Sequence, residues 1–330
     1  MTLEVSGQPH ANGLAAQSYP KLAALAGYVD RDSGIAEDFL TPVLGGARTV
    51  AVLSSPVGPL RGTTWVLCHS FALEQIYLQP LEVPFVRSLT AAGYEVLRYH
   101  SQGYGDSDLP AGSVSLQSHL RDAADAVELL RRRGATRIGL IGFRFGGSVA
   151  ALAADRVDAD ALILWEPVLK GRAFLNALAR RAIVSQLTVR ANQSSPAGST
   201  EDPLQRIDDE DTVDLQGFPL TRTSYEQILN MDLLKDLNRF AGKALVVQIS
   251  RSSEQRPDLK RLVKRLGEIG GSPAHEVVSH PRPQLFGGPR YRPTGTGEKR
   301  DTQADLLAAL TAATIGWCTK GDENAEELSQ

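Results

Sequence analysis

The stretch Gly142-Phe143-Arg144-Phe145-Gly146-Gly147 decides the fold, because it has the spacing of a nucleophile elbow, Gly-x-Ser-x-Gly, with arginine in place of serine. An apolar run at residues 137–141 precedes it, and the small residues 148–154, which favour a helix, follow it. Strand, sharp turn and helix are the context that the motif requires. A guanidinium stays protonated near neutral pH and has no lone pair with which to attack a carbonyl. The motif therefore predicts the turn but not its usual chemistry.

The composition is that of an ordinary soluble chain, with 330 residues, 42% hydrophobic and 22% charged, which is long enough for one large α/β domain with an insertion. A net charge of −3 argues against a nucleic acid or an anionic membrane as partner. The chain starts without the pattern of a signal peptide, and no run approaches the roughly 18 apolar residues of a membrane span, so we expect a cytoplasmic protein. Cys68 and Cys318 lie far apart and predict two reduced thiols rather than a disulfide or a zinc site.

Continuous apolar runs along the chain predict strands that are covered on both faces, at residues 64–68, 95–99, 137–141, 159–165, 244–249 and 274–278. Helices are predicted between them, at residues 84–92, at residues 116–133 and from residue 148 onward. This alternation predicts an α/β fold with a mostly parallel central sheet flanked by helices. Two further apolar runs, at residues 39–44 and 49–53, flank Gly45-Gly46 and predict a hairpin.

The chain divides into four predicted parts. Residues 1–35 are rich in small residues and predict a loosely tied N-terminal arm. Residues 36–166 and 241–318 form the α/β core, and residues 167–240, which mix helical and polar stretches, form a cap or lid insertion. The acidic tail at residues 319–330 is expected to be disordered.

Three motifs occur in order: His69-Ser70-Phe71 after a strand, the glycine-rich turn at residues 102–107, and the elbow. With these motifs, residues 39–318 resemble the α/β-hydrolase superfamily, which carries a His-Gly oxyanion turn, an Arg-Gly-x-Gly-x-Ser turn and the elbow. The resemblance implies an α/β-hydrolase fold with a helical cap. Within the superfamily, residues 164–172 and 250–259 resemble the hydrolase-like proteins associated with bacterial exosortase systems.

The resemblance also implies positions for a catalytic acid and a catalytic base. The acid would follow the strand at 244–249, where Glu254 is the nearest carboxylate, or the preceding strand, where Glu166 stands. The base would be His280, in the loop after the last strand, although Gln284 or Phe286 could occupy the expected place instead.

The same resemblance implies an oxyanion hole and a set of substrate contacts. Backbone amides near Ser70, Phe71 and Phe145 would form the oxyanion hole, and His69, Arg144 and Gln284 would contact the substrate. No metal-ligand spacing, phosphate-binding glycine loop or dinucleotide fingerprint occurs, so no metal or cofactor is expected. Arginines and lysines in the loop at 281–300 could form a rim that attracts an anionic substrate.

Arg144 would place a cation at a helix N-terminus, where the unpaired amides already carry partial positive charge, so an anion must compensate it. One alternative is an ion pair with Glu166 that closes the site. The other is a ligand carboxylate or phosphate, for example on an acyl thioester. The function accordingly remains open between acyl, ester or thioester chemistry on a small anionic substrate by an unconventional mechanism, and a catalytically inactive pseudoenzyme that binds a ligand or a partner.

Overall fold

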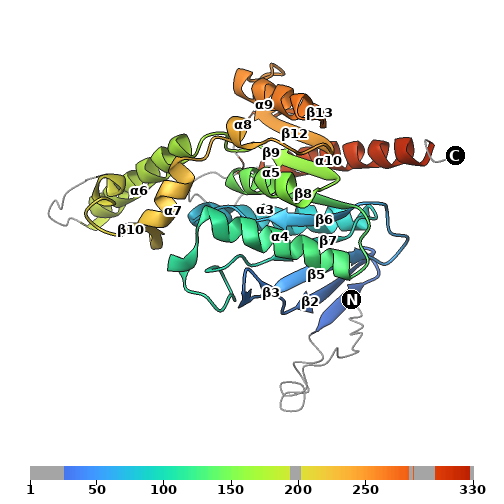
Figure 1. Cartoon of the computed structure of the whole chain (residues 1–330), viewed down its shortest axis with the longest axis horizontal. Helices are drawn as coiled ribbons and strands as arrows, with labels where there is room; N and C mark the ends of the chain where they lie inside the picture. The colour runs from blue at the N-terminus through green and yellow to red at the C-terminus, as the bar shows by residue number, and fades with distance from the viewer. Residues whose placement is uncertain (1–25, 194–201, 282–284, 286–301, 328–330) are drawn as a thin grey trace, which may run out of the picture.

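The computed structural model describes residues 26–193, 202–281, 285 and 302–327, and these form an α/β fold around one large sheet (Figure 1). Within this part of the chain the sheet has nine strands in the order β1-β2-β5-β7-β6-β8-β9-β12-β13. The strands from β7 to β13 pair in parallel, whereas β1, β2, β5 and β7 pair antiparallel. Their bounds are Gly27–Asp30, Ile35–Leu40, Ala51–Pro56, Val96–Tyr99, Thr64–Cys68, Ile138–Phe143, Ala161–Trp165, Lys243–Ser250 and Ser272–Ser279 in sheet order. The prediction of a mostly parallel sheet flanked by helices is confirmed.

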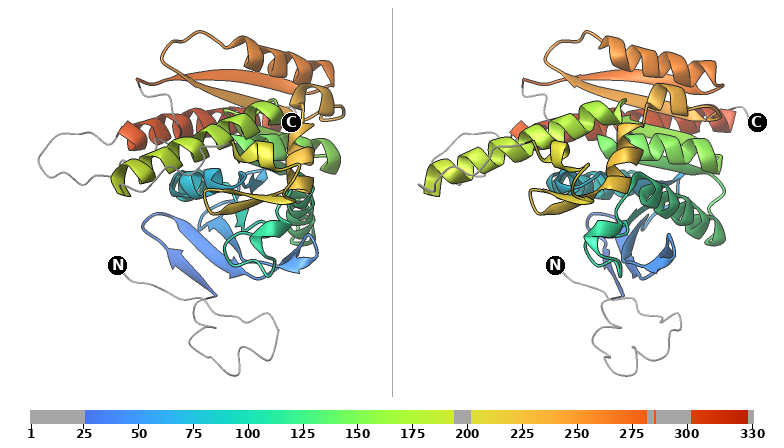
Figure 2. Two further views of the ribbon diagram at one scale, coloured as in Figure 1. Left: turned by 90° about the vertical axis from the view of Figure 1, so that its left-hand side faces the viewer. Right: turned by 60° about the vertical axis from the view of Figure 1, so that its left-hand side comes forward.

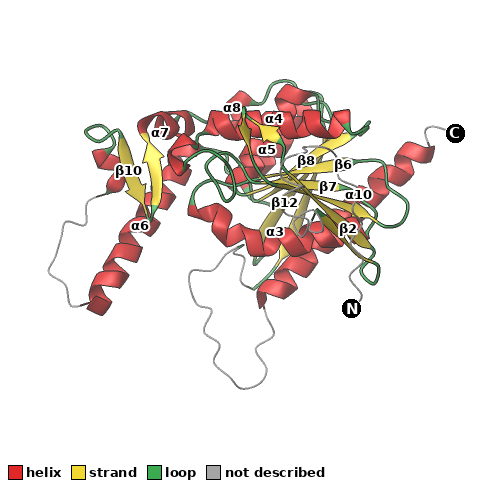
Figure 3. Cartoon of the chain, turned by 90° about the horizontal axis from the view of Figure 1, so that it is seen from below, coloured by secondary structure: helices red, strands yellow, loops and turns green. Residues whose placement is uncertain are grey.

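Helices cover both faces of the sheet because its central strands are apolar on both sides. In β6, Trp65 and Leu67 pack with α3 (Leu73–Ala91) and α10 (Thr302–Glu327), whereas Val66 and Cys68 pack with helices on the opposite face. Those helices are α4 (Leu116–Arg132), α5 (Phe145–Val157) and α9 (Pro257–Glu268), and Figure 3 shows α4 and α5 on the side opposite to α3. The two edges of the sheet, β1 and β13, lie at opposite ends of the molecule (Figure 2).

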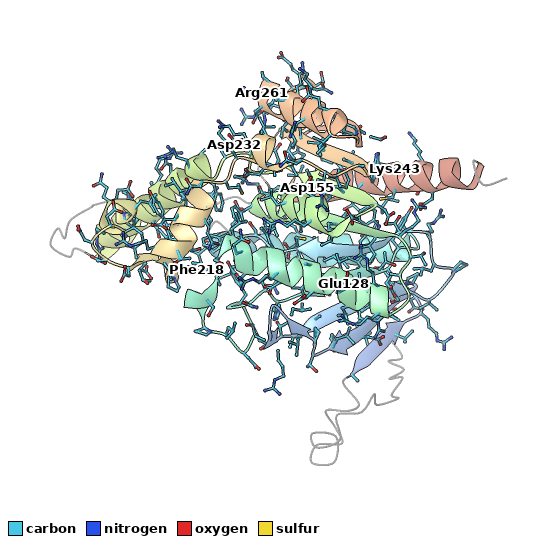
Figure 4. All side chains as sticks on the ribbon, viewed as in Figure 1. Glu128, Asp155, Phe218, Asp232, Lys243 and Arg261 are labelled. Carbon is cyan, nitrogen blue, oxygen red and sulfur yellow. The ribbon has the colours of Figure 1, made fainter. Side chains whose placement is uncertain are left out.

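The insertion between β9 and β12 forms the cap, which lies beside the carboxyl ends of the parallel strands. Its elements are α6 (Gly171–Gln193), the 3-10 helix η2 (Pro203–Arg206), the hairpin β10 (Thr212–Leu215) and β11 (Phe218–Thr221), α7 (Arg222–Leu229) and α8 (Leu233–Asp236). The chain returns from the cap to the core at residues 238–240, and Asp155 near the end of α5 fixes this segment. Its Oδ1 accepts hydrogen bonds from the three successive amides of residues 238–240 (Figure 4). The cap is therefore anchored to the helix that follows the elbow.

Three predicted boundaries differ from the structure. The predicted arm at 1–35 already contains β1, a four-residue edge strand too short and too weakly apolar to be recognised from sequence. Helix α3 begins at Leu73 rather than at Pro84, since Pro80 and Pro84 both lie inside the helix and interrupt its sequence signal. The predicted disordered tail from 319 continues α10 to Glu327, because Asp322 accepts a hydrogen bond from the Tyr94 hydroxyl at 2.8 Å.

Two other predictions are confirmed. The hairpin around Gly45-Gly46 is formed by β3 (Val43–Leu44) and β4 (Ala47–Arg48). Both cysteines are buried free thiols. No helix in the described ranges is long and apolar enough to cross a membrane.

A buried carboxylate, Asp122 on α4, holds the glycine-rich turn beside this hairpin. Its Oδ2 accepts a hydrogen bond from the Gln102 amide at 2.8 Å, and the Gln102 side chain donates in turn to the Leu44 carbonyl at 3.2 Å. Oδ1 of Asp122 is buried and has no hydrogen-bond partner in the described part of the chain. Burial raises the pKa of this carboxyl from 3.8 to about 7.

The raised pKa of Asp122 predicts how stability depends on pH. The folded state keeps the proton of Asp122 up to about pH 7, whereas the unfolded state releases it near pH 4, so this residue lowers stability as the pH rises between these values. Relative to Asp122→Asn, the free energy of unfolding of the wild type should fall by a few kcal/mol across this range, measured by urea denaturation. If the free energies of unfolding of the wild type and of Asp122→Asn differed by the same amount at pH 4.5 and at pH 8, the result would contradict this pKa.

The elbow itself depends on close backbone packing. A Cβ added to Gly146 would lie 2.5 Å from the Cys68 carbonyl oxygen, a backbone atom that cannot move without displacing β6. We expect Gly146→Ala to lower the free energy of unfolding by roughly 1–3 kcal/mol. Gly316→Ala is the matched control, because Gly316 lies in α10 with open space around it, and alanine there should stabilise the helix by up to about 1 kcal/mol. Equal stability of the two variants in urea would show that this packing is absent.

Candidate functional site

Three residues with strained backbone lie where parallel strands end. Ala72 follows β6 with φ 54°, Arg144 follows β8 with φ 53°, and Glu166 follows β9 with φ 49°. Residues other than glycine rarely adopt positive φ, because Cβ then crowds the backbone. Such strain persists where the surrounding structure imposes it, and it concentrates at functional sites. The carboxyl edge of the sheet is therefore the candidate site.

Arg144 lies in a sharp turn between β8 and α5, as the elbow motif predicts. Its amide donates to the Trp165 carbonyl at 2.9 Å, and its own carbonyl accepts from the amides of Gly147 and Val168 at 3.0 and 3.2 Å. These bonds fix the turn against the end of β9. The Arg144 side chain is 28% exposed, so the guanidinium lies at the border between the interior and solvent.

The anion beside Arg144 is Glu74, in the first turn of α3. Nε of Arg144 lies 3.3 Å from Oε1 of Glu74, while Oε2 accepts hydrogen bonds from the Phe145 amide at 3.2 Å and from the Ser70 hydroxyl at 2.6 Å. The Glu74 side chain is only 1% exposed. A buried carboxylate here receives a cation, a hydroxyl and an amide at the N-terminus of α5, all of which stabilise its negative charge.

Of the two anions considered for Arg144, the structure rules out Glu166 as its partner. Glu166 pairs with Arg256, whose Nη1 lies 2.8 Å from Oε2, and its Oε1 accepts a hydrogen bond from the Ile249 amide at 2.7 Å. Glu166 thus connects β9 to β12 and to the start of α9. Sequence reasoning missed Glu74 because it placed the start of α3 about eleven residues too late. One signal could have identified Glu74 from the sequence: it is an acidic residue in the first turn of a helix that follows the predicted oxyanion turn directly.

The other predicted acid and base positions are only partly described. Glu254 is exposed, and its carboxylate forms no ion pair in the described ranges; its backbone carbonyl accepts from the Gln248 side chain at 2.8 Å. His280 is buried just after β13, and its amide donates to the Ser250 carbonyl at 2.7 Å. Gln284 and Phe286 lie outside the described residues, as does most of the basic loop at 281–300. The catalytic roles of these residues stay predictions.

The amides of the predicted oxyanion turn mostly have acceptors within the protein. The Ser70 amide donates to Oε1 of Gln75 at 2.7 Å, and the Ala72 amide donates to the Tyr104 hydroxyl at 2.7 Å. The Phe145 amide donates to Glu74, whereas the Phe71 amide has no acceptor among the described residues. One donor stabilises an oxyanion less than two convergent donors do.

Aromatic rings pack against one another between the core and the cap. Phe145 stacks on Phe174 of α6 with centroids 4.7 Å apart, and Phe71 meets Phe218 of β11 edge-on at 5.2 Å. Figure 4 labels Phe218 where the cap approaches α4. These buried or half-buried rings form what we call the aromatic cluster, consisting of Phe71, Tyr104, His119, Phe145, Phe174 and Phe218.

Two buried histidines belong to the predicted oxyanion turn or contact it: His69 lies in the turn, and His119 on α4 contacts Ser70. His69 stacks on Tyr99 with centroids 5.5 Å apart, and burial, followed by the neighbouring histidines and Arg98, holds its pKa well below the ordinary value. His119 places Nε2 3.2 Å from the Ser70 carbonyl and Nδ1 2.9 Å from the Ser115 carbonyl. Burial lowers the pKa of His119, although the two carbonyls oppose this shift. Both rings are therefore buried parts of the scaffold rather than exposed bases.

Across the described ranges, no three or more histidine, cysteine, aspartate or glutamate side chains are grouped so that they could bind a metal ion.

Known proteins resemble this chain in fold more than in sequence. Residues 81–247 match the family described as serine aminopeptidase, S33, whereas no curated protein matches the chain significantly. The structure is similar to Est1E from Butyrivibrio proteoclasticus, with 16% identity, a TM-score of 0.53, and coverage of 86% of this chain and 98% of Est1E.

Two further solved structures agree. Est1E with bound ferulic acid matches with 19% identity and a TM-score of 0.51, covering 71% of this chain and 86% of that one. The esterase Est22 matches with 11% identity and a TM-score of 0.52, covering 90% of this chain and 84% of that one. Identities this low show a shared fold alone. Because the family match spans just over half of the 330 residues and the sheet is that of these esterases, the chain belongs to the serine aminopeptidase S33 family of α/β-hydrolases.

Proposed function

We propose that this hydrolase-like protein does not catalyse serine hydrolysis and instead acts as an accessory that binds a small anionic ligand or a partner. The observation that carries the proposal is the Glu74 carboxylate, which accepts the hydrogen bond of the Phe145 amide. In a serine hydrolase, the amide after the nucleophile donates to the oxygen on which negative charge develops. Here the Glu74 carboxylate of the protein itself already accepts the hydrogen bond of that amide.

The charges of the site oppose acyl transfer in two ways. Arg144 stands where the elbow motif has its nucleophile, and a guanidinium cannot attack a carbonyl. A substrate oxygen that becomes negative near Phe145 would also be repelled by the Glu74 carboxylate, whose Oε2 lies 3.2 Å from that amide. Both effects raise the barrier of the reaction that the fold usually supports.

The aromatic cluster supports the same proposal. Phe71, Phe145, Phe174 and Phe218 are all buried, so rings of the protein itself occupy part of the space between core and cap that an acyl group would enter. The likeness of residues 164–172 and 250–259 to hydrolase-like proteins of bacterial exosortase systems favours an accessory role.

A second candidate is acyl, ester or thioester chemistry by an unconventional mechanism. The observation that favours it is the Phe71 amide, which has no acceptor among the described residues and could polarise a carbonyl. This candidate needs a separate group for proton transfer, and His280 is the residue that the sequence assigns to that task. The occupied Phe145 amide makes it the weaker candidate.

An ester and thioester screen tests the proposed function directly. The wild type should hydrolyse 4-nitrophenyl acetate, 4-nitrophenyl butyrate and acetyl thiocholine no faster than buffer does, because the elbow has no serine nucleophile and the Phe145 amide already donates to Glu74. Arg144→Ser should stay inactive too, since Glu74 would still accept from the Phe145 amide. The esterase Est22 serves as the positive control of the assay. A burst of 4-nitrophenol from the wild type would reveal an acyl-enzyme and overturn the proposal.

A double-mutant cycle tests whether Glu74 and Arg144 act as one structural unit. Glu74→Gln should lower the free energy of unfolding by about 1–3 kcal/mol, because it weakens charge-assisted hydrogen bonds from three donors. Combined with Arg144→Gln, the two changes should show a coupling energy of about 0.5–3 kcal/mol in urea denaturation. Glu226→Gln, on the exposed side of α7, is the control and should change stability little. A coupling energy of zero would mean that the pair does not stabilise the fold.

A further inference from the structure

A chain of buried polar groups leads from the predicted oxyanion turn into α3. The Ser70 amide donates to Oε1 of Gln75 at 2.7 Å, and Nε2 of Gln75 donates to Oε2 of Glu82 at 2.8 Å. These three residues are 0%, 6% and 3% exposed, so both hydrogen bonds lie in the interior. Glu82 is thus connected to the turn through one intervening side chain.

The two ends of the Gln75 side chain constrain each other. Its oxygen can only accept hydrogen bonds, and its NH2 group can only donate them. The Ser70 amide is a donor and requires the oxygen, which leaves the NH2 group for Glu82. The Glu82 oxygen at this contact must then be an acceptor, as both oxygens of an ionised carboxylate are. The orientation of Gln75 therefore fits an ionised Glu82.

Burial opposes this ionised form. It raises the pKa of Glu82 from 4.5 to about 7, although the hydrogen bond from Gln75 and the attraction of Arg98 lower it. Arg98 comes from β7 and forms an ion pair with Glu37 of β2 at 3.3 Å, and neither β5 nor β6 carries a charged residue. The other charged side chains described on α3 and on α10, which packs against it, are exposed or have partners of their own: Glu74, Arg87, Asp305, Lys320 and Asp322.

We propose that Glu82 acts through Gln75 as a positioning residue, so that uptake of a proton by Glu82 releases the Ser70 amide for an anionic ligand. A protonated carboxyl contains an O–H donor that needs an acceptor. Oε1 of Glu82 makes no hydrogen bond in the described part of the chain, whereas a half-turn of the Gln75 amide brings an acceptor to Oε2. The same rotation places the NH2 group opposite the Ser70 amide, where two donors repel each other.

Release of Ser70 changes the donors that the turn offers. The Phe71 amide has no acceptor among the described residues, so the amides of Ser70 and Phe71 become two successive unpaired donors. Successive backbone amides in a turn form a site for an anion. The inference rests on the proposed function, because it adds regulation by a proton to the anion binding proposed there. Binding should be stronger below about pH 7, where Glu82 holds its proton, than above it.

Amide NMR of the full chain follows this switch at Ser70 itself. Labelling with ¹³C-carbonyl histidine and ¹⁵N-serine selects the His-Ser pairs of the sequence, which are His69-Ser70 and His100-Ser101, and Ser101→Ala assigns the two signals. We expect the Ser70 amide proton to shift upfield between pH 8.5 and pH 5.5, with a midpoint near pH 7, because the amide loses its hydrogen bond. Sodium acetate should move this midpoint to higher pH, since an anion that favours the protonated form must favour proton uptake in return.

Three variants separate Glu82 from other titrating groups. Glu82→Gln should abolish the Ser70 titration. Gln75→Met should abolish it too although Glu82 remains, which keeps the test decisive if Glu82→Gln perturbs the fold. Asp122→Asn is the matched control and should leave the titration unchanged, because Asp122 is a second buried carboxyl whose pKa is raised to about 7. A titration caused by His119, which contacts the Ser70 carbonyl at 3.2 Å, would persist in all three variants.

Any of three results would refute the proposal: a Ser70 shift that stays constant with pH in the wild type, a wild-type titration in Glu82→Gln or Gln75→Met, or a midpoint that acetate leaves unchanged. None of these measurements involves ester turnover. A failure here is therefore distinguishable from a failure of the proposed function, which the ester screen reports.

Discussion

The hydrogen bonds and the ion pair of the Glu74 carboxylate are the interactions on which the rest of the site depends. Its donors come from different elements: Ser70 follows β6, Arg144 forms the elbow after β8, and Phe145 begins α5. A carboxylate with 1% exposure is stable only when such donors replace the water that it has lost. The positions of α3 and α5 at the carboxyl edge of the sheet are therefore coupled through one buried charge.

The same coupling explains why an arginine is tolerated in the elbow. A cation next to the amides of a helix N-terminus is unfavourable on its own, and so is an unpaired carboxylate in the interior. Placed together, each removes the electrostatic cost of the other. The two residues therefore form one electrostatic unit, an internal ion pair at the turn between β8 and α5.

The sequence predicted the elements whose formation depends on a local pattern of residues. It failed where contacts between distant residues determine where an element ends or which partner a side chain has. The buried strands were predictable because continuous apolar runs such as residues 64–68 fit only positions covered on both faces. The start of α3 was missed because two prolines interrupt the helical pattern, and the end of α10 because the hydrogen bond from Tyr94 to Asp322 orders an acidic segment. The partner of Arg144 was missed for a related reason. Strand order brings Glu166 to the correct edge of the sheet, but the direction of its side chain is set by Arg256 and the Ile249 amide.

Two features of the site bear on the proposed function. Rings of the aromatic cluster pack between core and cap, and Glu74 accepts the hydrogen bond of the Phe145 amide. The Arg144 side chain is 28% exposed, and its Nη groups have no protein acceptor among the described residues. If the protein binds an anion as we propose, contact with Arg144 is therefore expected from the solvent side.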